Sequence, residues 1–451
     1  MDLKGVNHEG VFCCFQKKIC KELGRKAGFI KRKRAISAFR FLVMMTTGIT
    51  GIPHLSLAAM VEAVELKISR EALHERFTEF AFRFMKLCAN FVMKHKLNAA
   101  SIIRSKLLNH FNRIFIFDST SWDIHPALRK IFPGSKGAAS SANCKVQLCY
   151  EYLQGSISFF DIVPGTTSDN GYTSYLPDML KPGDLLITDL GYFCLNTFKR
   201  IAESKAYFLS RFHAGTCLYD AQTLAPIDLC SVLNAIEAPT HEIDVFMGAE
   251  KHNRIGCRLI CLRLSKELAE QHRRRHKQNA RRKGRTVNPR YLFLSGWIVM
   301  ITNAPSHWLP TNIVRPFYSL RWQIELIFKQ LKSVLAIHHV TTKNKNRLYC
   351  HVLGKLIMAV ILHKIHANLN IRLWNKKHQE ISFDKLFKRF QERSFTLTDL
   401  LLQSLSKMLI YLQKELNKLL NTCRKLKQKS RFSTLEKLEI LFCNHQKSFL
   451  T

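Results

Sequence analysis

Two short, almost wholly apolar segments place the strongest limit on how this chain can fold. They are residues 114–117 (IFIF) and 185–188 (LLIT). A strand of this kind has no polar face, so each segment is predicted to be buried on both sides at the centre of a sheet. Such a sheet needs helices on its faces, which points to the α/β class.

The segments around these two strands complete the predicted sheet. Residues 146–152 alternate between apolar and polar side chains, and Gly155-Ser156 turns the chain into a second strand at 157–163. Further elements are expected as helices near 172–180 and 196–204 and as a strand at 206–210. The order strand, hairpin, helix, strand, helix, strand predicts a mixed α/β sheet flanked by helices.

Composition and periodicity divide the chain into five regions. They are a helical, basic N-terminal region expected to bind DNA (1–105), the first part of the sheet core (106–215), a strand-rich segment with an exposed basic loop at 271–290 (216–305), the last helix of the core (306–345) and a helical C-terminal region (346–451). We hypothesise that apolar stretches at 356–362 and 400–412 in the last region form a dimer interface.

The N-terminal region carries two helix-start signals. Ser56 and Ser69 are predicted to be N-caps of helices over 57–66 and from Arg70 onward. Their spacing is that of a DNA-binding helix-turn-helix, although any small helical domain contains paired caps. Both interpretations remain open at this point.

The balance of charge indicates the kind of partner. Lys and Arg number 70 against 33 Asp and Glu, so the formal net charge is +37. A polyanion is the expected partner, with nucleic acid favoured over an anionic membrane surface. The charge gathers at residues 16–40, with ten basic residues against one acid, and at 271–290, with nine and no acid.

Membrane insertion and export are not expected. We find no apolar span of membrane length, and the first residues lack a basic segment followed by an apolar one. Fourteen cysteines without a C-x-x-C pair are expected to be reduced thiols. The expected location is the cytoplasm.

Two acids stand where the buried strands end. Asp118 follows the first strand and Asp189 follows the second. Either acid alone is more simply explained as the cap of a following turn. Two of them, on strands that could lie side by side, favour a functional site, because the carboxyl ends of strands in α/β sheets are where sites are built. A carboxylate there is costly unless it is paired or binds a metal.

A third acid lies on a helix predicted over 317–332. At 100° per residue, one face carries Tyr318, Arg321, Glu325 and Lys332, while an apolar stripe faces the core. A surface helix with ion pairs at i,i+4 spacing would explain Arg321 and Glu325. It would not explain why Tyr318 and Lys332 extend the same face.

Three carboxylates in a basic chain predict phosphodiester chemistry. Asp118, Asp189 and Glu325 could hold two Mg²⁺ ions about 4 Å apart, with Mn²⁺ able to substitute, and no small-molecule cofactor is expected. Arg321 and Lys332 are predicted to contact phosphates beside the scissile bond.

The motifs resemble those of one large family of bacterial insertion-sequence transposases. Tyr318-x2-Arg321-x3-Glu325-x6-Lys332 is similar to the family's Tyr-Arg-Glu-Lys signature, and Asp118-Ser119-Thr120 and Asp189-Leu190-Gly191-Tyr192 resemble the segments of its first two acids. The resemblance covers roughly residues 20 to 340. It implies a ribonuclease-H-like core with an Asp-Asp-Glu set and a β-rich insertion before the last core helix.

The resemblance also implies a reaction and its partners. Family members cut both strands at the element ends, commonly through a DNA hairpin, and join the 3′ ends to target DNA, so the expected partners are duplex DNA and a second copy of the chain. Trp297 stands where the family places a Trp that stacks on a flipped base, although a core aromatic is an equal alternative. Tyr318 would position the strand near the cut. The insertion would contact DNA through Arg273, Arg274, Arg275, Arg281, Arg282 and Lys283.

Two alternatives to a transposase remain. One is a nuclease with the same core that cuts without strand transfer, and the other is a DNA-binding regulator in which the acids are structural.

Overall fold

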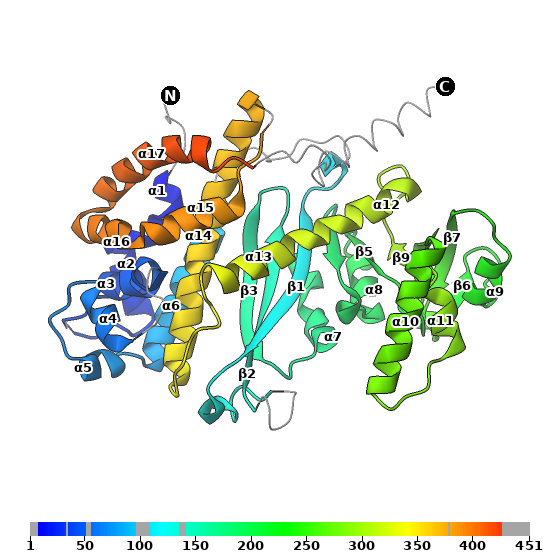
Figure 1. The fold of residues 1–451 in the computed structure, drawn as a ribbon, viewed down its shortest axis with the longest axis horizontal. Coiled ribbons are helices and arrows are strands. Elements are labelled where there is room, and N and C mark those ends of the chain that lie inside the picture. The colour runs from blue at the N-terminus through cyan, green and yellow to red at the C-terminus, as the bar shows by residue number, and fades with distance from the viewer. Residues whose placement is uncertain are drawn as a thin grey trace. The chain divides into compact units, whose positions relative to one another are not determined.

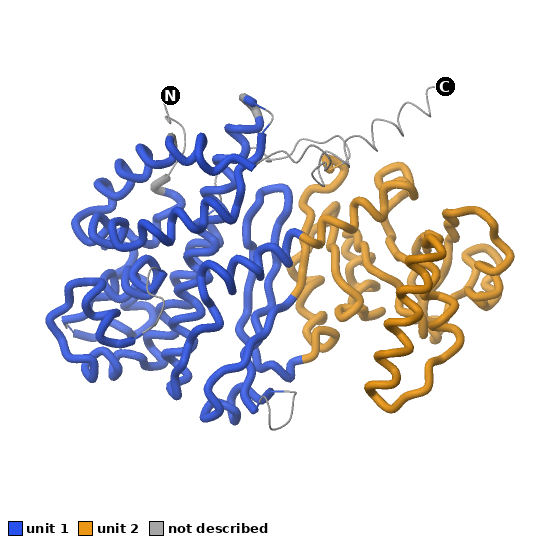
Figure 2. The backbone as a smooth tube through the Cα atoms, viewed as in Figure 1, with its two compact units in different colours: residues 1–103, 119–167, 323–427 blue, residues 104–118, 168–322, 428–451 orange. Residues whose placement is uncertain are grey.

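The computed structural model of the chain describes residues 8–32, 35–50, 56–95, 108–134, 141–377 and 379–425. Within them, nine strands form a mixed sheet in the order β3-β2-β1-β4-β5-β9-β8-β7-β6, and helices flank it (Figure 1). The predicted fold class, an α/β mixed sheet flanked by helices, is therefore confirmed. The chain packs into two compact units, which are described in turn (Figure 2).

Unit 2 holds the described residues 108–118 and 168–322. Its strands are the first half of β1 (Ile114–Asp123), β4 (Leu185–Thr188), β5 (Tyr207–Arg211), β6 (Leu218–Asp220), β7 (Thr240–Met247), β8 (Ile255–Arg263) and β9 (Trp297–Thr302). Its helices are α7 (Asp169–Tyr172), α8 (Leu195–Glu203), α9 (Leu229–Asn234), α10 (Lys266–Arg282), α11 (Pro289–Leu294) and α12 (Thr311–Tyr318).

The two apolar segments form the central strands of unit 2. β1 and β4 are parallel and fully buried over the paired residues, from Ile114 opposite Leu185 to Phe117 opposite Thr188. β5 continues the sheet in parallel with β4. Together with the antiparallel hairpin β2–β3, the order β3-β2-β1-β4-β5 is the ribonuclease-H-like arrangement that the resemblance implied. The helix predicted near 172–180 is instead the short α7 followed by 3-10 turns, the second of which begins at Pro177.

The prediction of an exposed basic loop at 271–290 is wrong, because most of this segment is helical. Ser265 caps α10, whose 17 residues run to Arg282, and α11 begins at Pro289. Arg, Lys, Gln and Ala are good helix formers, and a helix with charge on most faces can remain solvated. Gly284, with φ of +60°, ends α10, and the N–H of Arg285 turns back to the carbonyl of Ala280.

Unit 1 holds the described residues up to 95, then 119–167 and 323–425. Its helices are α1 (His8–Val11), α2 (Lys17–Lys26), α3 (Ala38–Val43), α4 (Leu57–Glu62), α5 (Arg70–His74), α6 (Glu79–Lys94), α13 (Trp322–Ser333, which begins in unit 2), α14 (Lys345–Lys377), α15 (Phe383–Glu392), α16 (Ser394–Gln403) and α17 (Leu405–Thr422). The strands β2 (Asn143–Glu151) and β3 (Ser156–Pro164) form its hairpin. The N- and C-terminal regions, expected to be separate, therefore belong to one unit.

The long helix α14 is the core of unit 1. It packs against α6 and against the π turn Met44–Gly48, where Gly354 allows the close approach, since a Cβ at this position would lie 1.6 Å from the carbonyl oxygen of Met45. By length and composition α14 is long and apolar enough to cross a membrane, contrary to expectation, but 94% of its most apolar stretch is buried inside the structure. Residues 356–362, proposed for a dimer interface, are part of this core and are not available to a partner.

The N-terminal caps form as predicted, but the helices are shorter. The hydroxyl oxygens of Ser56 and Ser69 accept hydrogen bonds from the N–H groups of Ala59 and Ala72, each at 3.1 Å. α4 ends at Glu62 and α5 at His74. The cysteines in the described part of the chain are free thiols.

Candidate active site

The two predicted aspartates lie side by side at one edge of the sheet in unit 2. Asp118 and Asp189 directly follow Phe117 and Thr188, the last paired residues of the parallel strands β1 and β4. Both carboxylates are half-buried. β1 does not end at Asp118, as the sequence had suggested, but continues to Asp123. The position of Asp118 is therefore set by the end of its pairing with β4.

Tyr318, at the end of α12, contacts the second aspartate. Its hydroxyl lies 3.3 Å from Oδ1 of Asp189 and 3.3 Å from the carbonyl oxygen of Thr188, and it is the donor to both. Burial, and then the negative charge of Asp189, raise the pKa of the Tyr318 phenol above its usual range. The phenol therefore stays protonated and serves as a hydrogen-bond donor.

Arg321 contacts the first aspartate from the 3-10 turn Ser319–Arg321, which joins α12 to α13. Its Nη1 donates to Oδ2 of Asp118 at 2.9 Å, and the two side chains are 18% and 19% exposed. An ion pair with this little solvent is screened far less than one on the surface. Arg321 and Tyr318 thus each contact one of the two aspartates.

A buried arginine that the sequence did not reveal supports α12. Nη1 of Arg258, on β8, donates to the carbonyl oxygens of Ala304 and Leu309 at 2.8 and 3.0 Å, and its Nε donates to Glu242 at 2.6 Å. These bonds hold the connection from β9 to α12. No local sequence signal distinguishes Arg258 from the many surface arginines, because its partners lie on β7 and in the connection from β9 to α12, both distant in the chain.

Glu325 and Lys332 lie on α13 in unit 1. Glu325 is half-buried, and Nζ of Lys332 donates to the carbonyl oxygen of Ser121 at 3.1 Å, while burial lowers the pKa of the Lys332 ammonium. The predicted apolar stripe of this helix is buried at every position. Its members are Leu320, Ile324, Ile327 and Leu331.

The donor chemistry of the aspartate pair fits a hard divalent cation. Asp118 and Asp189 offer carboxylate oxygens, which Mg²⁺ prefers. Among the described residues, no group of three or more His, Cys, Asp and Glu side chains is arranged to hold a metal ion. Two adjacent carboxylates are thus in place within unit 2, and a third ligand would have to be added to them.

Two tryptophans differ in their access to solvent. Trp297, the predicted base-stacking residue, is 8% exposed, and the guanidinium of Arg263 lies 4.6 Å from the centroid of its ring. Trp322, which sequence reasoning overlooked, directly follows Arg321 and is 56% exposed. The available signal was its position about 200° around the helix from Leu320, far from the buried stripe.

The predicted DNA-contacting basic residues lie along α10 and at its end. Arg273 packs toward α11, where its Nε donates to the carbonyl oxygen of Leu292. The others are exposed, and Arg274 pairs with Glu270 one turn earlier. These are Arg274, Arg275, Arg281, Arg282 and Lys283.

Comparison with known proteins gives consistent similarities. Residues 109–361 match the family described as the transposase DDE domain. The chain is 32% identical to the transposase for insertion sequence element IS231B of Bacillus thuringiensis subsp. berliner, over 87% of each chain. It is 30% identical to the transposase for insertion sequence element IS1151 of Clostridium perfringens, over 83% of this chain and 84% of the relative.

Among solved structures, the piggyBac transposase synaptic complex with hairpin DNA is similar at a TM-score of 0.44 and 9% identity. That match covers 94% of this chain and 87% of the other.

Proposed function

The chain belongs to the transposase DDE domain family, and from this premise we propose how it acts as an insertion-sequence transposase: Asp118, Asp189 and Glu325 carry the cutting and joining of DNA. The observation that carries the proposal is the aspartate pair of unit 2. Each of the two acids is held by a different residue of the signature, Asp118 by Arg321 and Asp189 by Tyr318.

Glu325 is the proposed third acid because of its distance from Arg321 along the chain. Four residues of helix advance the backbone by about 6 Å and return to the same face. Arg321 contacts Asp118, so an acid one turn further on is suited to join the same set.

We propose Mg²⁺ as the resident metal, with Mn²⁺ as a substitute, held by the three carboxylates. When bound, a pair of such ions activates a water or a 3′-hydroxyl and stabilises the leaving oxygen of the phosphodiester. The protein residues orient this set: Tyr318 donates to Asp189, and Nη1 of Arg321 donates to Asp118. The guanidinium of Arg321 and the ammonium of Lys332 are the proposed contacts for phosphates beside the cut.

For the second-strand step we propose a DNA hairpin in which an aromatic side chain stacks on an unpaired base. Both tryptophans are candidates. Exposure favours Trp322, because the ring of Trp297 is buried and covered by Arg263. Stacking of a base on an aromatic ring is worth about 1–3 kcal/mol.

DNA binding by the chain follows from its charge. We propose that the exposed face of α10 contacts the backbone of element-end or target DNA. Binding should weaken steeply as the salt concentration rises, because binding releases counterions from the DNA. The protein would act at the bacterial chromosome. A second copy is proposed for synapsis of two ends, through residues 400–412, where Ile410 is exposed, and not through the buried 356–362.

One incubation tests the proposed function. Full-length protein is mixed with labelled DNA carrying the element ends, a target plasmid and Mg²⁺, and cut and joined products are separated on gels. We expect Asp189→Asn to bind the ends like the wild type but to cut at less than about one-hundredth of its rate. Asp178→Asn is the matched control, because this exposed acid pairs with Arg200 on the surface of unit 2.

The same incubation separates the alternatives. Cut ends without joined products would indicate a nuclease, and binding without metal-dependent cutting by the wild type would indicate a regulator. If Asp189→Asn cut DNA at the wild-type rate, Asp189 would not be a catalytic residue.

A further inference from the structure

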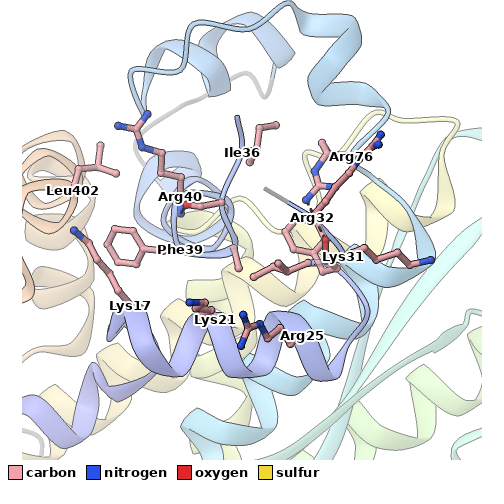
Figure 3. A pocket seen from close by; sticks show the side chains of 14 residues that line it. Lys17, Lys21, Arg25, Lys31, Arg32, Ile36, Phe39, Arg40, Arg76 and Leu402 are labelled. Carbon is pink, nitrogen blue, oxygen red and sulfur yellow. Dashed lines mark hydrogen bonds between the residues drawn. The ribbon is translucent and has the colours of Figure 1, made fainter. Parts of the chain in front are cut away.

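A basic hollow in unit 1 is built mainly from the basic segment 16–40, and none of its lining residues belongs to the proposed active site. Its volume is about 660 Å³, and it is lined by α2, the segment that follows it, α3 and Leu402 of α16 (Figure 3). No Asp or Glu lines it, although seven of its lining residues are basic. The seven are Lys17, Lys21, Arg25, Lys31, Arg32, Arg40 and Arg76.

The fold gathers these cations from several segments. Lys17, Lys21 and Arg25 recur every four residues, so one face of α2 presents all three. Figure 3 shows them on one side of the hollow, with Lys31, Arg32 and Arg76 grouped at another. The turn after α2 is tight.

Glycine permits this tight turn. A Cβ at Gly24 would meet Cδ1 of Ile30 at 2.8 Å, and Gly28 has φ of +73°. Arg76 is anchored from a distant segment, with its guanidinium 4.0 Å from the ring centroid of Phe29. The hollow is therefore a product of the tertiary fold and not of one basic stretch of sequence.

The charge in the hollow lacks a carboxylate counterpart. In the described part of the chain, six of the seven cations have no acidic group within ion-pair distance. These six are Lys17, Lys21, Arg25, Lys31, Arg32 and Arg40. Like charges held together around a concave surface raise the local potential and attract a polyanion.

We propose that this hollow binds the phosphates of an unpaired DNA strand. The inference rests on the proposed function, since cutting and hairpin steps expose unpaired DNA. Basic and apolar side chains together line the hollow, which suits an unpaired strand whose bases are accessible as well as its phosphates. The volume lies in the range of about 300–1,000 Å³ that accommodates small ligands, so a few nucleotides fit.

The lining also suits the uncharged part of a nucleotide. Ile36, Phe39 and Leu402 add apolar surface between the cations. Proteins that bind single strands combine a positive groove along the backbone with apolar or aromatic surface for sugars and bases.

The test compares single-stranded and duplex DNA on the full-length protein. Fluorescence anisotropy is measured with a labelled oligonucleotide of about 12 nucleotides and with the duplex of the same sequence. The variant Lys21→Ala/Arg25→Ala removes two exposed cations of α2. Its matched control, Lys388→Ala/Lys414→Ala, removes two exposed lysines from α15 and α17 of the same unit, away from the hollow.

We expect the pocket variant to weaken binding of the single strand at least about tenfold at about 0.1 M salt, and to reduce the slope of log K against log salt by about 1.4. Duplex binding and the control variant should stay within about twofold of wild type. Equal weakening of single strand and duplex, or no change in either, would overturn the inference. Labelled ATP provides a further arm: loss of ATP binding with unchanged binding of the single strand would assign the hollow to a free nucleotide and also overturn it.

Failure here is distinguishable from failure of the proposed function. Metal-dependent cutting that is lost in Asp189→Asn would leave the transposase assignment standing, even if the hollow bound no single strand. A wild type that does not cut or join DNA, yet binds single strands through α2, would support the inference about the hollow and contradict the proposed function.

Discussion

Arg321 and Asp118 form an ion pair at 2.9 Å, although 203 residues separate them in the chain. The pair joins the turn between α12 and α13 to β1, at the residue that follows the last pair of β1 with β4. It places a guanidinium at the point where the proposed reaction needs positive charge, and it compensates a half-buried carboxylate.

Replacement of Arg321 by Ala should reduce DNA cutting at least about 100-fold, because Asp118 loses its partner and the phosphate loses a donor fork. Arg321→Lys should recover only part of this rate, since a lysine keeps the charge without the planar fork. The measurement is the rate of end cutting under single-turnover conditions. Arg200→Ala, which breaks an ion pair between more exposed residues, is the control and should cut normally. Normal cutting by Arg321→Ala would remove the pair from the proposed site.

Removal of the Tyr318 hydroxyl should have a smaller effect. Tyr318→Phe loses one weak hydrogen bond to Asp189, worth about 0.5–1.5 kcal/mol, so we expect cutting to slow about threefold to tenfold. The raised pKa of Tyr318 keeps the hydroxyl protonated, so the ratio of wild-type to variant rates should stay constant from about pH 7 to 9. A ratio that falls with rising pH would show that the phenol ionises in this range. Tyr175→Phe, at an exposed tyrosine, serves as the control.

The two tryptophans should separate in a hairpin assay. Trp322→Ala is expected to slow hairpin formation about tenfold or more, because the base loses its stacking partner. First-strand nicking should stay within about twofold, because removal of an exposed ring leaves no cavity in the core. Trp322→Phe should restore most of the hairpin rate.

Trp297→Ala should instead lower the free energy of unfolding by about 3–5 kcal/mol, measured by urea denaturation, because the side chain is buried. Equal losses of nicking and hairpin formation in Trp322→Ala would argue against a stacking role. A Trp297→Ala protein of normal stability that fails only at the hairpin would return that role to Trp297.

Lys355 should make stability depend on pH. It is 1% exposed on α14, its Nζ donates to the carbonyl oxygen of Ala336 at 2.7 Å, and burial lowers its pKa to about 7. Between this value and the unfolded pKa near about 10.4, the unfolded chain binds more protons. Stability should therefore rise with pH above about 7, at up to about 1.4 kcal/mol per pH unit from this group.

The variant Lys355→Met isolates this contribution. The difference in unfolding free energy between wild type and variant, measured in urea at about pH 7, 7.5 and 8, should shift in favour of the wild type as pH rises. Buried thiols oppose the trend at higher pH, because burial raises the pKa of groups such as Cys20, but they are common to both proteins. A difference that does not change with pH would mean that Lys355 keeps its ordinary pKa.

Local sequence determined the elements whose signals are short-range. The apolar runs of β1 and β4 and the caps Ser56 and Ser69 needed no distant partner to be predicted, since burial on both faces and capping are local properties. The two flanking strands predicted a loop at 271–290, whereas the good helix formers in this run form α10.

Long-range packing decided the rest. The sequence by itself determined which residues are chemically special: two acids after buried strands, the Tyr-Arg-Glu-Lys face, and a large positive excess. Only the tertiary structure decided that Arg321 reaches Asp118, that Arg258 holds the connection to α12, that α14 is a core helix, and that the cations of α2 face a hollow with Arg76. The physical reason is that these contacts join segments far apart in the chain, so each becomes favourable only when the fold has already met the entropic cost of closing the loops between them.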